Sequence, residues 1–489
     1  MIDRRRFILG ATGFATVAMT PFQVWSQLKK EYPNVLMLIV DDLNDWVGAM
    51  GGHPNAKTPN IDKLADQGTL FTNAHASAPL CGPSRASIMT GRAPSSTGIY
   101  GHIHDNDIRK VDKAKHSVFL SEYFKKHGYY TAGVGKVFHE AAADGSFDDF
   151  GGRYKGFGPY PEKPLKWDKK GTSTDWGPFP ESDEQMPDYD SAHWIANKLK
   201  QQHDKPFFMA CGFLRPHVPW HVPKKWFDMH PAKDLFLPAY MSKDLSDVPE
   251  IARLITDHPM MPTTEWALEH DEFRNIVQAY LASVSFVDSC VGIVLDALKY
   301  SDYANNTAVV LWGDHGYHLG EKDKFAKMTL WERATRTPLI IKPPKSNGKQ
   351  VSNKPVSLLD LYPTLISMCG LPANSDNEGR DISPLLKNPD APWEHAVVTT
   401  YGENNHAVKT ERYRYIRYED GAEELYDHLV DKDEWKNVAN EPAYLNVLKE
   451  LRKQLPKVNE KWTQHSHYNG NYYFMQKTKA AGGLVPANE

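Results

Sequence analysis

The sequence predicts an α/β protein built on a large, mostly parallel sheet that is sandwiched by helices. Residues 34–40 and 307–312 are continuous apolar runs, which are typical of strands buried on both faces. Segments with apolar residues at helical spacing, such as 60–67 and 273–298, lie between runs of this kind. Buried strands that alternate with helices indicate a parallel sheet between two helical layers.

Two further helix–strand pairs extend the same alternation. The first is a helix expected over 117–126, ended by Gly128 and followed by a strand over 129–134. The second is a helix over 192–199 followed by a strand over 207–213. Both pairs support the same fold class.

Two long segments, 143–187 and 216–263, interrupt this alternation and are rich in Gly, Pro, Asp and Trp. Neither shows the spacing of a helix or a strand. Long irregular loops inside a domain are usually functional, so we expect both segments to wall a cleft.

The pattern changes again after about residue 393. Short apolar and aromatic runs between turns predict antiparallel strands over 396–400, 413–418 and 424–426, and a helix near 444–455. We therefore expect a main domain over 28–393 and a smaller C-terminal antiparallel α+β subdomain over 394–489, with a loose tail from about Gln476.

Composition excludes several classes of protein. The 489 residues include 57 Lys and Arg against 61 Asp and Glu, a formal charge of −4 that excludes the broad basic surface of a nucleic-acid binder. An anionic substrate must therefore be drawn by a local cluster of charges. Four cysteines are too few for a disulfide framework, and we expect Cys211, Cys290 and Cys369 to be small buried residues.

Residues 1–27 are expected to be an export signal. Arginines 4–6 precede a mildly apolar stretch that ends near Phe22 and, at about 16 residues, is too short for a transmembrane helix. Paired arginines before Phe-Ile-Leu resemble a twin-arginine signal. A frayed basic tail is the alternative. With the signal, a bacterium would export the chain to the periplasm or secrete it, without membrane insertion.

Acidic residues follow the two buried strands. Asp41 and Asp42 come directly after the first strand, and Asp314 and His315 follow the later one. Ligands of open α/β sheets bind at the carboxyl ends of strands, and a cation would relieve the repulsion between these carboxylates. Three carboxylates suit calcium or magnesium, whereas an imidazole ordinarily favours a transition metal. Solvated turns are the alternative.

Cys81 is predicted to begin a helix. Pro83 suits the first helical turn and Gly91 is a stop signal, so exposed backbone amides near Cys81 would favour an anion. Arg85 lies one turn further and can bind an anion in a bidentate way. The residues alone allow two interpretations of Cys81, a thiolate nucleophile of low pKa or a cysteine packed beneath the helix.

The segment Cys-Gly-Pro-Ser-Arg at 81–85, followed by Thr-Gly-Arg at 90–92, resembles the signature of the sulfatases, in which the cysteine is oxidised to formylglycine. Other motifs of that family follow in the same order, at 34–42, 133–139, 215–217 and 313–321 with Lys327. The resemblance is closest to the iduronate-2-sulfatases, through Gly-Lys-Val-Phe-His, Pro-His and Asp-His. It covers residues 34–345 and returns at 408–431. The segment with Tyr317, His318 and Phe325 differs from the vertebrate iduronate enzymes, which leaves the sugar open.

This resemblance implies an alkaline-phosphatase-like fold and one divalent cation, usually calcium. Its ligands would be Asp41, Asp42, Asp314, His315 and the modified residue 81. A formylglycine-generating enzyme would convert Cys81 during maturation, and the hydrated aldehyde would be the nucleophile. One of its hydroxyls would attack sulfur, and the other could later expel sulfate.

The resemblance also implies the roles of the surrounding residues. Arg85 and Lys136 would neutralise charge on the nucleophile and the sulfate. His139 would be the general base for the second hydroxyl. His217 and Lys327 would bind sulfate oxygens and support the leaving alcohol, one of them as the general acid.

The expected function is an exported carbohydrate sulfatase that hydrolyses an O-sulfate ester of a sulfated oligo- or polysaccharide. A phosphatase or phosphodiesterase of the same superfamily is the first alternative, although it would typically hold two metals and a Ser or Thr nucleophile. A non-catalytic, calcium-dependent glycan-binding protein is the second. Position in the sequence suggests sugar contacts from His102, His104, Trp220 and residues 403–406.

Overall fold

The computed structural model describes residues 32–169, 172–346, 348–468 and 470–483. The predicted export signal over 1–27 lies outside these residues. Residues from Pro33 onward cluster as one unit, and the predicted boundary at 393/394 stays a prediction.

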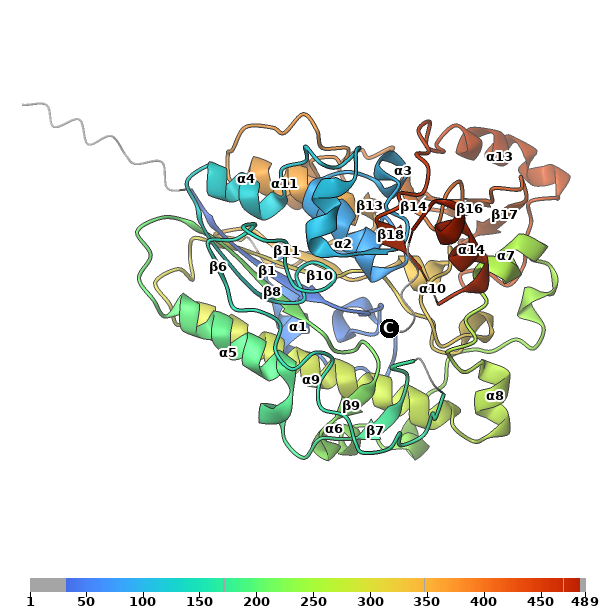
Figure 1. The fold of residues 1–489 in the computed structure, drawn as a ribbon, viewed down its shortest axis with the longest axis horizontal. Coiled ribbons are helices and arrows are strands. Elements are labelled where there is room, and N and C mark those ends of the chain that lie inside the picture. The colour runs from blue at the N-terminus through green and yellow to red at the C-terminus, as the bar shows by residue number, and fades with distance from the viewer. Residues whose placement is uncertain (1–31, 170–171, 347, 469, 484–489) are drawn as a thin grey trace, which may run out of the picture. The chain divides into compact units, whose positions relative to one another are not determined.

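An eight-stranded sheet forms the centre of this unit (Figure 1). Five of its seven strand pairings are parallel, and only the two pairings of β11 are antiparallel. The predicted large, mostly parallel sheet is therefore confirmed. In spatial order its strands are β12 (Gln350–Ser352), β2 (Thr69–Phe71), β11 (Leu339–Lys342), β10 (Thr307–Gly313), β1 (Asn34–Val40), β8 (Phe207–Phe213), β5 (Tyr130–Gly135) and β6 (Asp149–Phe150).

The central strand β1 explains why helices cover both faces of the sheet. Its side chains alternate between faces, as the strand period requires. Leu36, Leu38 and Val40 belong to one buried cluster, and Met37 and Ile39 belong to another. The first cluster includes residues of α1 (Pro59–Ala65), α5 (Pro187–Leu199) and α9 (Phe273–Lys299), and the second those of α2 (Cys81–Thr90), α4 (Leu120–Lys126) and α11 (Leu361–Met368).

The predicted helices differ from the observed ones mainly at their first turns. α5 begins at Pro187, five residues before the predicted start at 192, because proline fits the first turn of a helix. α4 begins at Leu120 rather than 117, because the Glu122 carboxylate accepts the Phe119 N–H and caps the helix.

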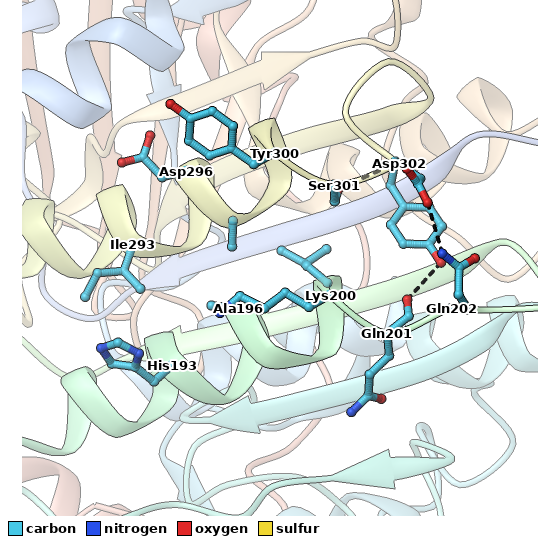
Figure 2. Close-up of a pocket in the computed structure, with 13 residues that line it drawn as sticks. His193, Ala196, Lys200, Gln201, Gln202, Ile293, Asp296, Tyr300, Ser301 and Asp302 are labelled. Atoms are coloured by element: carbon cyan, nitrogen blue, oxygen red, sulfur yellow. Dashed lines mark hydrogen bonds between the residues drawn. The ribbon is translucent and has the colours of Figure 1, made fainter.

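A pocket of about 460 Å³ opens between α5 and α9 (Figure 2). His193 and Ala196 of α5, Asp296 of α9 and Tyr300 directly after α9 contribute to its lining. None of the residues predicted to form the functional site lines it.

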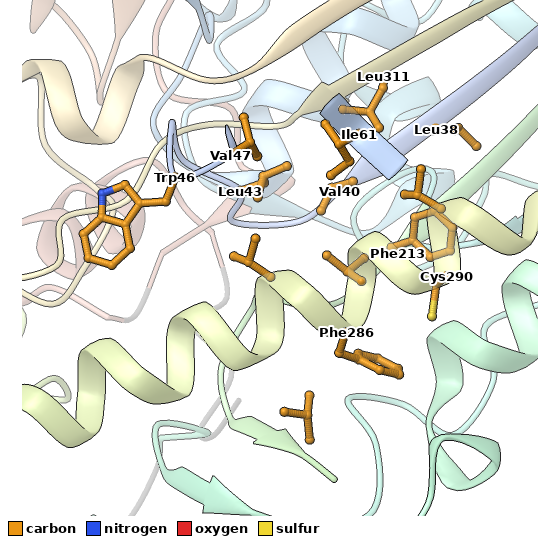
Figure 3. Close-up of a cluster of buried hydrophobic side chains, with 14 of the residues drawn as sticks. Leu38, Val40, Leu43, Trp46, Val47, Ile61, Phe213, Phe286, Cys290 and Leu311 are labelled. Carbon is orange, nitrogen blue, oxygen red and sulfur yellow. The ribbon is translucent and has the colours of Figure 1, made fainter. Parts of the chain in front are cut away.

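Helix α9 packs its apolar face beneath the sheet. Figure 3 shows Phe286 and Cys290 of this helix beside Val40 and Phe213 at the ends of two strands. α9 is long and apolar enough to cross a membrane, but 72% of its most apolar window is buried in the fold, and a core helix passes the same test. Cys290 is fully buried, as are Cys211 and Cys369, which confirms their predicted place in the core.

The two irregular segments pair with each other. β7 (Trp176–Pro178) comes from the first and β9 (Trp220–Val222) from the second, and they form a short parallel pair. Asp175 joins the segments further, because its carboxylate accepts the backbone N–H of Leu165 and pairs with His221 at 2.9 Å. Short helices, α6 (Lys224–Asp228) and α7 (Glu250–Ile255), occupy part of the second segment.

The predicted antiparallel C-terminal subdomain is present as a four-stranded sheet. Its strands are β14 (Val397–Thr400), β15 (His406–Lys409), β16 (Tyr413–Arg417) and β17 (Glu423–Asp427), followed by α13 (Leu445–Arg452). The loose tail expected from Gln476 is wrong for residues 476–480, and residues 484–489 lie outside the described part of the chain. Helix α14 (Tyr472–Ala480) covers this position, because Phe474 and Thr478 are buried and the Asn471 side chain caps the first turn.

Candidate active site

The acidic residues predicted as metal ligands meet at one edge of the main sheet. β1 and β10 are parallel neighbours with Val40 opposite Gly313, so the residues that follow them emerge together. Asp42 has a left-handed backbone (φ 60°), and its N–H donates to Asp314 Oδ1 at 3.1 Å. His315 Nε2 lies 3.4 Å from Asp42 Oδ1 and 3.5 Å from Asp314 Oδ1.

Cys81 is the first residue of α2 and faces this cluster, as the helix prediction requires. Ser84, one turn on, donates its hydroxyl to the Asp314 carbonyl at 2.6 Å and fixes the helix against the end of β10. Cys81 Sγ lies 3.3 Å from His315 Nε2 and 2.9 Å from Lys327 Nζ. Burial, and then the charge of Asp41, raise the pKa of the Cys81 thiol. The interpretation as a low-pKa thiolate therefore finds no support.

These residues could hold a divalent cation. Ligand atoms of Asp41, Asp42, Cys81 and His315 all lie within 4.8 Å of one another, and all four residues are buried. Asp42 Oδ2 is buried and has no hydrogen-bond partner among the described residues. His315 Nδ1 lies 2.9 Å from the Gly316 carbonyl, which places the ring proton there and leaves Nε2 free to coordinate. The donor set fits the predicted metal, with Asp314 beside it.

Arg85 is fully buried and ties the carboxylates together. Its Nε donates to Asp314 Oδ2 at 2.9 Å, and its Nη2 lies 3.3 Å from Asp41 Oδ1. Its Nη1 donates to the backbone carbonyls of Lys136 and Val137. Burial alone would lower the pKa of Arg85, but Asp314 and Asp41 outweigh it and raise that pKa. The predicted anion binder thus holds the metal cluster and the loop after β5.

Two lysines complete the charge pattern. Lys136 Nζ lies 2.6 Å from Asp41 Oδ2, and Lys327 Nζ lies 2.5 Å from Asp42 Oδ1. Burial would raise the pKa of Asp41, but Lys136 and Arg85 hold it well below its ordinary value. For Asp42, burial prevails over Lys327 and raises the pKa. The site therefore concentrates three cations around three carboxylates.

Two histidines lie at the side of this cluster. His139 stacks on His102 with ring centroids 4.1 Å apart, and its backbone N–H donates to Asp105 at 3.1 Å. His217 stacks on Phe157 at 4.8 Å. Burial lowers the pKa of both histidines well below the ordinary value. For His139 this favours the neutral imidazole that a general base needs. A proton-donor role for His217 needs a bound anion beside its ring, which would raise its pKa again.

All the predicted site residues thus fall in one region, and the structure adds two arginines that the prediction missed. Arg215 is buried and donates to the carbonyls of Phe157, His217 and His221. It belongs to the Arg-Pro-His motif, so that motif could have indicated it. Arg153 lies in a glycine-rich loop beside Phe157 and carries no sequence signal.

The predicted sugar contacts have mixed outcomes. Trp220 is fully buried and packs edge-on against Tyr280, so its predicted place in the cleft is wrong. His102 stacks on His139 and pairs through β4 (His102–Ile103) with β18 (Ser466–His467). The C-terminal segment thereby reaches the site, and its Tyr468 ring lies 6.1 Å from the His102 ring.

Comparison with known proteins gives one family over nearly the whole chain. The family model for sulfatases matches residues 33–371, and the model for the C-terminal part of N-sulphoglucosamine sulphohydrolase matches residues 320–461. A sulfatase of Formosa agariphila is 50% identical over 470 residues, which cover 93% of this chain and 92% of that protein. Iduronate 2-sulfatase of Homo sapiens is 31% identical over 393 residues, which cover 69% of each.

Solved structures share the fold at lower identity. Phosphonate monoester hydrolase of Agrobacterium radiobacter has a TM-score of 0.70 at 20% identity, over 87% of this chain and 97% of that one. A protein in complex with its substrate D-glucosamine-2-N,6-O-disulfate has a TM-score of 0.68 at 22% identity, over 86% and 96%. These likenesses confirm the alkaline-phosphatase-like fold. The sequence matches show that the chain belongs to the sulfatase family, whose members are sulfuric ester hydrolases.

Proposed function

We propose that this chain is an exported carbohydrate sulfatase that removes an O-sulfate from a sulfated glycan. The observation that carries the proposal is the position of Cys81. It is buried, and its Sγ contacts His315 and Lys327 and lies 3.8 Å from Asp42 Oδ1. Relatives named iduronate 2-sulfatase and ulvan-active sulfatase support a glycan substrate. The fold neighbour bound to a disulfated glucosamine agrees with it.

One divalent cation, which we propose is calcium, would be held by Asp41, Asp42, Asp314, His315 and residue 81. It would supply positive charge that neutralises an oxygen of the sulfate group. Arg85 keeps the carboxylates in place by its contacts with Asp41 and Asp314.

Formylglycine made from Cys81 by a formylglycine-generating enzyme would supply, as its hydrate, a hydroxyl nucleophile and a second hydroxyl. Burial keeps the pKa of His139 well below its ordinary value, so its imidazole can accept a proton as the general base. Lys136 and Lys327 carry charge that binds sulfate oxygens. His217 stacks on the Phe157 ring, which Lys136 also approaches, and His217 and Lys327 are the two candidates to protonate the leaving alcohol.

The buried charges favour a sulfatase over a phosphatase of the same superfamily. Sites with two metals need further acidic or histidine ligands, whereas here Lys136 and Lys327 already contact the carboxylates. A sulfate monoester also carries one negative charge fewer than a phosphate monoester at neutral pH. A non-catalytic glycan-binding protein would need neither a cysteine at the nucleophile position nor the basic residues around it.

Two measurements on purified protein test this proposal. Peptide mass spectrometry of active protein is expected to show residue 81 about 18 Da lighter than cysteine, the change from thiol to aldehyde. Rates on matched sulfate and phosphate esters are expected to favour sulfate. Unmodified Cys81 in fully active protein would contradict the nucleophile, and faster phosphate hydrolysis would make the enzyme a phosphatase.

Export is tested separately. Replacement of Arg5 and Arg6 by lysine is expected to leave the precursor in the cytoplasm of a bacterial host, because a twin-arginine signal depends on the arginine pair. Unchanged recovery of the variant from the periplasm or medium would reject the twin-arginine signal.

A further inference from the structure

Arg153 lies at the same sheet edge as the predicted site, although no motif indicates it. β6 is the parallel neighbour of β5, with Gly133 opposite Phe150. The pairing continues one step further, because the Gly135 N–H donates to the Gly152 carbonyl at 2.8 Å. Arg153 therefore leaves the sheet edge beside Lys136.

One aromatic ring connects Arg153 with the sulfate-handling residues. The Arg153 guanidinium lies over the Phe157 ring, 4.4 Å from its centroid, and Lys136 Nζ is 5.6 Å from the same centroid. The His217 imidazole stacks on this ring at 4.8 Å. Arg153 Nη1 also donates to the Glu140 carbonyl at 3.1 Å, next to His139. These contacts place Arg153 between the loops that carry the two histidines of the site.

The charge of Arg153 is not balanced by a carboxylate contact within the part of the chain that the structure describes. Its Nε is buried and has no hydrogen-bond partner among the described residues. Arg215 differs, since its Nε, Nη1 and Nη2 all donate to backbone carbonyls. A buried charged donor without an acceptor is costly unless a ligand supplies one. Burial also lowers the pKa of Arg153, although the Asp41 carboxylate acts in the opposite direction.

We propose that Arg153 binds a second anionic group of the substrate, a carboxylate or a second sulfate, beside the sulfate ester that is hydrolysed. The inference rests on the proposed sulfatase function and narrows its substrate to glycans with an anionic group near the reacting sulfate. A planar guanidinium suits both groups, because it can donate two parallel hydrogen bonds to two oxygens. Both Arg153 and Lys136 contact the Phe157 ring, which places the two cations in the same part of the site.

The kinetic test compares Arg153→Gln with wild type on three kinds of sulfate ester. These are a neutral monosaccharide O-sulfate, a uronate O-sulfate and a monosaccharide disulfate. We expect Arg153→Gln to lower kcat/KM on the anionic sugar it serves by about 10- to 100-fold and to change it less than about threefold on the neutral ester. A loss of kcat/KM on the uronate O-sulfate identifies the bound group as the carboxylate, and a loss on the disulfate identifies it as the second sulfate. Arg153→Lys should recover part of the loss.

A binding test separates this inference from the proposed function. The Cys81→Ala background removes the nucleophile, so that binding is measured without turnover. In this background Arg153→Gln is expected to raise the Kd of the same uronate or disulfated sugar by about 10-fold or more. Arg253→Gln, at an exposed arginine that donates to the Leu245 carbonyl, is the matched control. Equal loss on neutral and anionic esters, or an unchanged Kd, would overturn the inference. Wild-type protein that hydrolyses no sulfate ester would instead overturn the proposed function.

Discussion

Asp42 is the site residue whose bonding is least complete. Its Oδ1 contacts Lys327, but its Oδ2 is buried and unpartnered among the described residues, and burial raises its pKa. A divalent cation would supply the missing partner. This gives a direct test of the metal site that does not depend on the identity of the sugar.

Chelation followed by dialysis is expected to lower activity by at least about 100-fold, and added calcium should restore it. Asp42→Ala should reduce the bound metal, measured by atomic emission, from one equivalent to near zero. Asp66→Ala, at an exposed carboxylate paired with Lys349, is the control and should keep its metal. Metal retained by Asp42→Ala would contradict this ligand set.

The proton donor can be assigned from the position of Cys81. Lys327 Nζ lies 2.9 Å from Cys81 Sγ, on the side of the nucleophile. In an in-line displacement the leaving oxygen departs from the opposite side, so we expect His217 to be the donor. His217→Ala should lose about 100-fold or more on a sugar sulfate, but less than about 10-fold on 4-nitrophenyl sulfate, whose leaving group needs no proton.

Lys327→Ala is the comparison for this assignment. If His217 is the donor, Lys327 would bind the sulfate rather than the leaving alcohol, and its removal should lower kcat/KM by a similar factor on both esters. If Lys327→Ala lost more activity on the sugar sulfate than on 4-nitrophenyl sulfate, and His217→Ala lost the same on both, Lys327 would be the proton donor instead.

At the scale of elements, helix α5 holds the loop that carries His217. Asp188, in the first turn of α5, accepts the backbone N–H of Leu214 at 2.7 Å and of Arg215 at 2.9 Å. Arg215 in turn donates to the His217 carbonyl at 3.3 Å. The start of α5 at Pro187 therefore sets the position of the loop that carries His217.

Asp188→Ala is expected to destabilise the fold by about 2–5 kcal/mol, because two buried N–H groups lose their acceptor. Urea unfolding measures this loss, and kcat/KM should fall with it through displacement of His217. Asp190→Ala, two residues along the same helix at a half-buried carboxylate paired with Lys155, is the control and should change stability by less than about 1 kcal/mol. An unchanged urea midpoint for Asp188→Ala would show that Asp188 does not hold the loop.

Asp188 also predicts a pH dependence of stability. Burial raises the pKa of Asp188 to about 6 from its ordinary 3.8, so the folded protein binds a proton more tightly than the unfolded chain. The contribution of protonated Asp188 to the free energy of unfolding is fully present below about pH 4. It is lost as the pH rises through about 6, a change of about 3 kcal/mol. Asp188→Asn should lack this part of the pH dependence of unfolding. Parallel curves for the variant and wild type would contradict it.

Long apolar runs made the central strands predictable, whereas the shorter and irregular segments carry too little signal to predict. β1 and β10 are seven-residue apolar runs buried on both faces, so their type and their adjacent acidic ends follow from the sequence. β15 and the pairing of β7 with β9 involve three or four residues each, too few to show a period. Arg153 lies among glycines without any motif, so only the fold brings it to Phe157.

At the scale of the whole molecule, a buried ion network joins a short helix just before β11 of the main sheet to the C-terminal sheet. Arg414 of β16 contacts Glu332, at the start of α10 (Glu332–Thr335), with Nη2 at 2.5 Å, and Glu434 with Nε at 2.8 Å. The Glu332 backbone N–H also donates to Glu434 at 2.8 Å. Burial would raise the pKa of Glu332, but Lys409 and Arg414 hold it well below its ordinary value.

This network makes the two predicted domains depend on each other during unfolding. Arg414→Leu would leave two buried carboxylates without their guanidinium, so we expect a loss of about 3–5 kcal/mol in urea unfolding. Arg417→Leu, on the same strand but with a side chain 39% exposed beside Glu423, is the matched control and should lose less than about 1 kcal/mol. Equal losses in the two variants would show that the junction does not depend on buried charge.

Because the network crosses the 393/394 boundary, wild type should unfold in one transition, and a separate early transition of the C-terminal strands would show that they fold on their own.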